Sequence, residues 1–131
     1  MIQPTEDAIK ALITLYQSGN LEEAESKANE LLKDFPNEIT ILNILGAIQD
    51  GKGKSEEAIK TYQKALNINE RSSETHFNMG SVLHRLARNK DARICYEEAI
   101  NLKSDFTNAY FNLGLVCQNL QDYESAEKNY L

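Results

Sequence analysis

The chain has 131 residues, 26% of them charged, and a formal net charge of −6. This length is enough for one ordinary domain with an apolar core. The acidic balance argues against a nucleic-acid-binding surface, which needs clustered basic side chains. No run of about 18 apolar residues is present, so we expect no membrane span. The first residues lack a secretory signal pattern, and we therefore expect a cytoplasmic protein.

The first half of the chain reads as two pairs of helices. In residues 5–38, a first predicted helix ends at the Gly19-Asn20 turn and a second carries "EEAESKANELL". In residues 39–72, a first helix ends at the turn of residues 51–53 and a second carries "EEAIKTYQKAL". Apolar residues recur three and four positions apart, the spacing that places them on one face of a helix.

The second half repeats this arrangement. Residues 73–106 predict a helix, a turn at Arg88-Asn89 and a second helix carrying "DARICYEEAI". The basic cluster "HRLARNKDAR" at residues 84–93 is expected to be this solvated turn and helix start. Residues 107–131 predict a helix, a turn at Gln121-Asp122 and the beginning of a second helix. Because the sequence stops there, we expect a piece of a longer protein, or an end that another molecule covers.

Small and aromatic residues recur every 34 residues along the chain, in phase with the predicted helix pairs. A glycine inside a helix costs up to about 1 kcal/mol relative to alanine, so its repetition indicates that another helix comes close. We expect each glycine to face an aromatic residue of the second helix, small against large. The recurring residues are Ala24, Ala58, Ala92 and Ala126; Gly46, Gly80 and Gly114; and Tyr62, Tyr96 and Tyr130.

The same spacing predicts a packing stripe on the first helix of each repeat. The first repeat departs from the pattern, because Leu12 replaces the glycine and Ala28 replaces the aromatic residue, and we expect looser or altered packing there. The predicted stripes are Leu42, Leu45, Gly46 and Gln49; His76, Met79, Gly80 and Leu83; and Tyr110, Leu113, Gly114 and Cys117.

This pattern resembles the tetratricopeptide repeat, which has a period of about 34 residues and the signature W-x-x-L-G-x-x-Y…A…F…P. The resemblance covers residues 5–131, as repeats at about 5–38, 39–72, 73–106 and a truncated 107–131. It implies an all-α fold, an α-solenoid of seven to eight helices in antiparallel pairs that wind into a right-handed superhelix. A single array spanning residues 1–131 is expected, similar to the N-terminal arrays of bacterial multi-domain proteins.

The family architecture implies that the first helices line a concave groove. The face opposite the packing stripe combines apolar side chains with asparagines, whose amides both donate and accept hydrogen bonds to an extended peptide backbone. Aromatic side chains add area that can anchor a partner. We therefore expect a protein or peptide segment to bind there. The candidate residues are Asn43, Ile44, Phe77, Asn78, Ser81, Arg85, Asn108, Phe111, Asn112 and Leu115.

Two interpretations of this face remain open. Asn78 and Asn112 are similar to the start of the asparagine ladder in the repeat domain of O-linked N-acetylglucosamine transferase. Alternatively, the phenylalanines fill the space between neighbouring first helices. A clamp for the acidic tails of heat-shock chaperones is excluded by the sequence, because the matching positions hold no cation to offset the desolvation of a carboxylate.

No catalytic residues, cofactor or metal site are expected. The segment "GAIQDGKG" at residues 46–53 lacks the Ser or Thr that a phosphate-binding loop needs, and the two cysteines have no zinc spacing with the histidines. We expect a non-enzymatic interaction module. The alternative is an accessory arm of a larger enzyme, such as a glycosyltransferase or sulfotransferase. A third alternative is self-association, through Tyr123, Ala126 and Tyr130 on the uncapped last helix.

Overall fold

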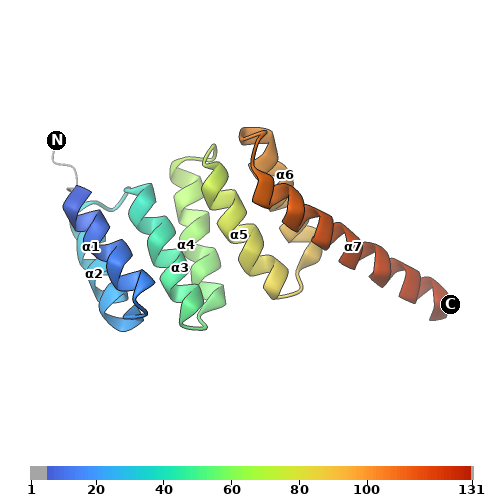
Figure 1. Cartoon of the computed structure of the whole chain (residues 1–131), viewed down its shortest axis with the longest axis horizontal. Helices are drawn as coiled ribbons and strands as arrows, with labels where there is room; N and C mark the ends of the chain where they lie inside the picture. Colours follow the sequence, from blue (N-terminus) through green and yellow to red (C-terminus); the bar gives the residue numbers. More distant parts are fainter. Residues whose placement is uncertain (1–5, 131) are drawn as a thin grey trace. The chain divides into compact units, whose positions relative to one another are not determined.

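The computed structural model describes the backbone of residues 6–130 and the side chains of residues 6–122, and every regular element in that part is an α-helix (Figure 1). The chain divides into two compact units, residues 1–70 and residues 71–131. None of the helices described combines the length and apolar character that crossing a bilayer requires. The first unit holds α1 (Glu6–Gln17), α2 (Leu21–Asp34), α3 (Ile39–Gly51) and α4 (Ser55–Ile68). The second holds α5 (Ser73–Arg85), α6 (Asn89–Leu102) and α7 (Thr107–Tyr130).

A residue with positive φ follows the first helix of three repeats. These residues are Gly19 (φ 83°), Gly53 (φ 80°) and Ala87 (φ 61°), and they occupy the same position in consecutive repeats. The left-handed conformation reverses the chain so that a second helix can begin, and glycine adopts it without a steric penalty. The first two turns lie where the sequence predicts them. The third occupies residues 86–88, since α6 already begins at Asn89.

The turn predicted at Gln121-Asp122 is wrong, because α7 runs through it as one helix of 24 residues (Figure 1). Gln121 is the residue of the fourth repeat that corresponds to Ala87, where a left-handed residue would have to stand. A residue with a Cβ atom pays about 1–2 kcal/mol in that conformation. Continuing the helix avoids this cost, so the fourth repeat has no second helix of its own among the described residues.

Glycine and tyrosine pack against each other in both units, as predicted. A methyl group added at Gly46 would lie 2.6 Å from Cζ of Tyr62, and one added at Gly80 would lie 3.0 Å from Cε1 of Tyr96. Both tyrosines are buried. The alanines of the second helices, Ala24, Ala58, Ala92, Ala65 and Ala99, are fully buried as well. The recurring small residues therefore mark the surfaces at which paired helices come close.

The first repeat keeps this complementarity with the two sides exchanged. Leu12 stands where the other repeats have glycine, and Ala28 stands where they have tyrosine. Both residues are fully buried in one apolar cluster that also includes Ala24, Ile41 and Ile48. The large side chain now comes from the first helix and the small one from the second. The packing is altered, as expected, but the pair is not loosely packed.

A second buried stripe on the first helices was not predicted. It lies one residue before the predicted stripe, at Ile41 and Ile48 of α3 and at Ala109 and Val116 of α7, all of which are buried. In the first unit, Ile41 and Ile48 share an apolar cluster with Ala24 and Ala28 of α2. In the second unit, α7 packs mainly against α6. The signal of this second stripe in the sequence is a pair of apolar residues seven positions apart, which is two turns of a helix.

The predicted packing stripe of α7 is largely exposed. The Tyr110 side chain is 51% exposed and Cys117 is also exposed, whereas Leu113 is half-buried. A methyl group at Gly114 would have nothing within 4 Å. This expectation was therefore wrong for Tyr110, Gly114 and Cys117, because the helix that would cover them continues straight on. We call Tyr110, Leu113, Gly114 and Cys117 the open face of α7.

Lys52 links the end of α3 to α2. Its Nζ lies 2.6 Å from Oε1 of Glu22 and 3.0 Å from Oε1 of Glu25. The hydrogen bonds to these carboxylates hold the pKa of Lys52 well above its usual value, and Lys52 in turn lowers the pKa of Glu22. This pairing helps to fasten the turn at Gly53 against the first repeat.

Alanine at two equivalent glycines should have opposite effects. Gly46→Ala pushes a methyl group into the Tyr62 ring, so we expect the free energy of unfolding to fall by about 1–3 kcal/mol. Gly114→Ala meets open space and replaces a poor helix former, so we expect a gain of up to about 1 kcal/mol. Urea unfolding followed by circular dichroism at low protein concentration measures both. Equal losses at the two positions would contradict the packing described above.

Ala87→Gly should stabilise the second unit. Glycine removes the steric cost of a side chain at φ 61° but adds freedom to the unfolded chain, and we expect a net gain of about 0.5–1 kcal/mol. Gly53→Ala is the matched control, because it introduces the same strain into an equivalent turn and should be destabilising. Thermal melting of both variants checks the pair. A loss of stability in Ala87→Gly would count against a strained turn.

Candidate functional site

Tyr96 connects the three helices of the second unit. Its ring lies against Gly80 of α5, and its hydroxyl donates a hydrogen bond to Oγ of Ser81 at 3.3 Å. Burial raises the pKa of the Tyr96 phenol, while hydrogen bonds with Ser81 and Asn112 and the nearby charge of Arg85 act in the opposite direction. The tyrosine thus comes from α6 and brings its polar end to residues of α5 and α7.

Phe77 is part of the packing as well as of the predicted face. Its ring centroid lies 4.8 Å from that of Phe106 and 5.7 Å from that of Tyr96, and its side chain is half-buried. Nζ of Lys103 lies 5.0 Å from the centre of the Phe106 ring. Phe77 therefore joins α5 to α6 and to the segment between α6 and α7, and these contacts are not with a neighbouring first helix.

A polar contact also joins the end of α5 to the middle of α7. Nδ2 of Asn119 and Nε2 of His84 lie 3.4 Å apart, and the His84 ring meets Tyr96 edge-on at 6.3 Å. Ser81 and Asn112 are already joined through Tyr96. These contacts link residues of the predicted face on α5 with residues of the predicted face on α7. His84 and Asn119 were not among the predicted binding residues, although both lie on the predicted face.

The remaining predicted residues of the second unit are accessible. The Phe111 side chain is 68% exposed and the Leu115 side chain is 38% exposed. Arg85 and Asn108 are also exposed, and Asn78 is half-buried. We call the set formed by Asn78, Ser81, Arg85, Asn108, Phe111, Asn112 and Leu115 the α5–α7 surface. Its apolar area comes almost entirely from α7, and its polar groups come from both helices.

The two predicted residues of the first unit lie on α3. Asn43 is only 6% exposed, and Ile44 is half-buried against the apolar cluster of that unit. Asn43 has polar interactions within the chain. Its amide therefore offers little surface to a partner in this structure. The sequence pattern did not reveal this, because Asn43 occupies the position that holds Phe77 and Phe111 in later repeats.

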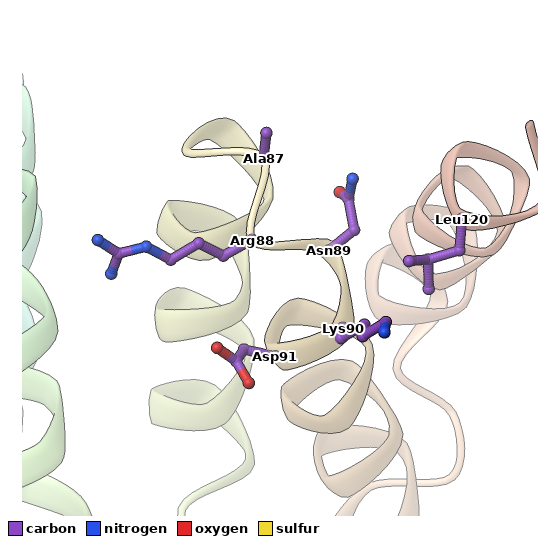
Figure 2. Close-up of a pocket in the computed structure, with 6 residues that line it drawn as sticks. All are labelled: Ala87, Arg88, Asn89, Lys90, Asp91 and Leu120. Atoms are coloured by element: carbon purple, nitrogen blue, oxygen red, sulfur yellow. The ribbon is translucent and has the colours of Figure 1, made fainter. Parts of the chain in front are cut away.

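A pocket of about 440 Å³ lies beside the α5–α6 turn. Figure 2 shows Lys90 pointing toward the α7 side, where Leu120 lies, while Arg88 and Asp91 extend to the other side. Oδ1 of Asn89 is buried without a hydrogen-bond partner in the described part of the chain. The pocket coincides with the predicted basic cluster, but both signs of charge line it. It is separate from the residues that make up the α5–α7 surface.

Sequence comparison decides the family. A model described as "TPR repeat" matches residues 52–86, and one described as "Tetratricopeptide repeat" matches residues 73–106 and 107–131. Together these matches extend over more than half of the chain. The chain belongs to the tetratricopeptide repeat family. Neither family model describes an enzyme. No curated protein sequence matches this tetratricopeptide repeat chain significantly.

Solved structures share the tetratricopeptide repeat fold. The crystal structure of MamA is 23% identical with a TM-score of 0.77, over 98% of this chain and 72% of that one. The first repeat domain of Spaghetti (RPAP3), bound to the HSP90 peptide SRMEEVD, is 16% identical with a TM-score of 0.81, over 92% and 99% of the chains. An O-GlcNAc transferase from Thermobaculum terrenum is 22% identical with a TM-score of 0.74, over 87% of this chain and 23% of that one.

Variants of Tyr96 should separate the role of its ring from that of its hydroxyl. Tyr96→Phe keeps the ring against Gly80, so we expect a loss of at most about 1 kcal/mol of stability. Tyr96→Ala leaves a cavity and should cost about 3–5 kcal/mol. Urea unfolding measures both changes. A large loss in Tyr96→Phe would mean that the hydroxyl, rather than the ring, holds the three helices together.

Proposed function

We propose that the chain is a non-enzymatic protein-interaction module and that the α5–α7 surface binds an extended segment of a partner protein. The observation that carries this proposal is the exposure of Phe111 and Leu115 on α7. Neither side chain is among the fully buried residues of α7, which are Ala109 and Val116. Large apolar side chains that remain in water beside polar groups are typical of a binding surface.

The polar residues around these side chains fit a peptide backbone. Asn108 and the half-buried Asn78 carry amides that can donate to a carbonyl and accept from an N–H group. Ser81 and Asn112 are tied to Tyr96, so their side chains are held in place before a partner arrives. Less conformational freedom is then lost on binding. We infer a partner that supplies apolar side chains to Phe111 and Leu115 and backbone polar groups to the asparagines.

The similar structures support this class of function without naming the partner. The RPAP3 domain is bound to an acidic HSP90 peptide, but the positions that would clamp such a tail hold no cation in this chain. A carboxylate that gives up water without a cation in return is unfavourable. We therefore propose that the partner is not recognised through an acidic tail. The net charge of −6 also favours a protein partner over nucleic acid, and we propose no contact with a membrane.

A second candidate function is an accessory arm of a larger enzyme, for example a glycosyltransferase. The similarity to the O-GlcNAc transferase favours it, since this chain matches only 23% of that protein. In that case the same surface would recruit the substrate of an attached catalytic domain. The complete reading frame separates the two functions, because an arm requires a catalytic domain in the same chain.

Binding should depend on the two exposed apolar residues. Short random peptides displayed on phage are selected on the chain, and the affinity of the best peptide is measured by calorimetry. The double variant Phe111→Ala, Leu115→Ala should weaken it at least about 30-fold, since each truncated anchor costs more than about 1 kcal/mol. Helicity should be retained, because neither residue belongs to the buried core of the second unit.

The matched control is Ile94→Ala on α6. Its side chain is 61% exposed and lies on a helix outside the proposed surface. Peptide affinity should stay within about twofold of the original chain, well under the tenfold change that about 1.4 kcal/mol produces. Equal losses in the control and the double variant would argue against a specific surface on α5 and α7.

A further inference from the structure

We propose that the open face of α7 binds the carboxyl-terminal part of α7 from a second copy of the chain, and that the copies associate head to tail. The proposal does not depend on the α5–α7 surface. It starts from a comparison of the three repeats that carry the glycine. Gly46 is covered by Tyr62 and Gly80 is covered by Tyr96, whereas Gly114 has nothing within 4 Å.

The chain itself contains the missing partner of Gly114. In the two repeats whose glycine is covered, the covering tyrosine follows the glycine by 16 residues. The residue 16 positions after Gly114 is Tyr130. Ala126 likewise stands where the buried Ala58 and Ala92 stand in those two repeats. The side chains of Ala126 and Tyr130 lie outside the described residues. Their sequence positions nevertheless match those of a second helix that packs on an open face.

The course of α7 prevents this segment from reaching its own glycine. The helix is continuous from Thr107 to Tyr130. The rise of an α-helix therefore separates Gly114 from Tyr130 by about 24 Å along the axis. A second helix covers a glycine only by reversing direction, and α7 does not reverse at Gln121. Residues 123–130 of the same molecule therefore do not cover Gly114, and we propose that the same segment of a second copy does.

The helical phase decides the kind of assembly. Between Gly114 and Tyr130 the chain rotates by about 160° beyond four full turns, because each residue of an α-helix adds about 100°. Positions 114 and 130 of the helical backbone therefore lie on nearly opposite sides of the helix axis. A two-fold pair of α7 helices needs both on the same side, so it cannot form both contacts at once. Each copy instead receives a neighbour on one side and inserts into another on the opposite side, which produces an open chain of subunits.

The open face of α7 is exposed and has room for another helix to pack against it. Tyr110 is 51% exposed, Cys117 is exposed, and the bare backbone of Gly114 allows close approach. The contact involves only a few turns of one helix pair, which is small compared with a stable dimer interface. We therefore expect association to be weak and visible only as the protein concentration rises.

Sedimentation velocity over a concentration series tests the proposal. The average mass of the original chain should rise past two copies without a plateau. Gly114→Leu fills the receiving side and Tyr130→Ala removes the inserted ring, and each should raise the concentration needed for association at least tenfold. An equal mixture of the two variants should form pairs and nothing larger, because only one of the two contacts is intact.

Three controls make the outcome decisive. Gln121→Gly restores a residue that adopts positive φ readily, so the carboxyl-terminal segment can fold back on its own Gly114 and the protein should become monomeric. Ile94→Ala changes an exposed side chain of α6, away from α7, and should leave association unchanged. Circular dichroism checks that every variant keeps its helices, and because Gly114 and Gln121 are exposed, we expect folding to be retained.

Cysteine labelling gives an independent readout. Cys117 is exposed, whereas Cys95 is buried and its thiol pKa is raised to about 11 by burial and by Asp91. A thiol reagent should therefore react first at Cys117, and at least tenfold more slowly when the protein is concentrated enough to associate. A monomer at every concentration, a mass that stops at two copies, or association that survives Gly114→Leu would overturn the proposal.

Discussion

The second unit depends on the contact between the Tyr96 ring and the backbone of Gly80. The absence of a side chain at Gly80 lets α5 and α6 approach until the ring fills the space between them. Because Tyr96 is also long enough to reach Ser81, the same residue fixes polar side chains that face outward. Packing and surface chemistry are therefore coupled. A change at Gly80 would move the ring, and with it the hydrogen-bonding groups of the neighbouring helix.

In the first unit, the paired helices also pack closely, but the large side chain comes from the first helix and the small one from the second. Leu12 and Ala28 exchange the large and small partners of the pair, and the buried cluster around them includes residues of three helices. What the fold requires is the sum of the two side-chain volumes, since protein interiors are filled to nearly constant density. The identity of the residue at each site is free as long as that sum is kept. This freedom explains why the first repeat departs from the pattern and still packs.

A single backbone conformation separates the fourth repeat from the others. Gly19 and Gly53 adopt positive φ without strain, Ala87 adopts it at some cost, and Gln121 remains helical. The packing gained by a returning helix has to exceed the cost of the turn, which is about 1–2 kcal/mol for a residue with a Cβ atom. The result is the long helix α7, in which no second helix packs against the face that contains Gly114. Its exposed residues include Phe111 and Leu115, for which we propose peptide binding, and Tyr110 and Gly114, for which we propose self-association.

For the first three repeats, the sequence alone determined the helices, their pairing and the contacts of the recurring glycines, alanines and tyrosines. These features depend on local periodicity and on side-chain size, and both can be read without coordinates. It also predicted a surface on α5 and α7 that includes the exposed Phe111 and Leu115. Only the tertiary structure decided that Asn43 is buried, that Phe77 stacks on Phe106 and Tyr96, and that α7 continues past Gln121. Each of these outcomes depends on what a residue meets from another part of the chain, or on a small difference between turn strain and packing. A repeat pattern shows neither these contacts nor this energy difference, because it records which residue types recur and not what surrounds them.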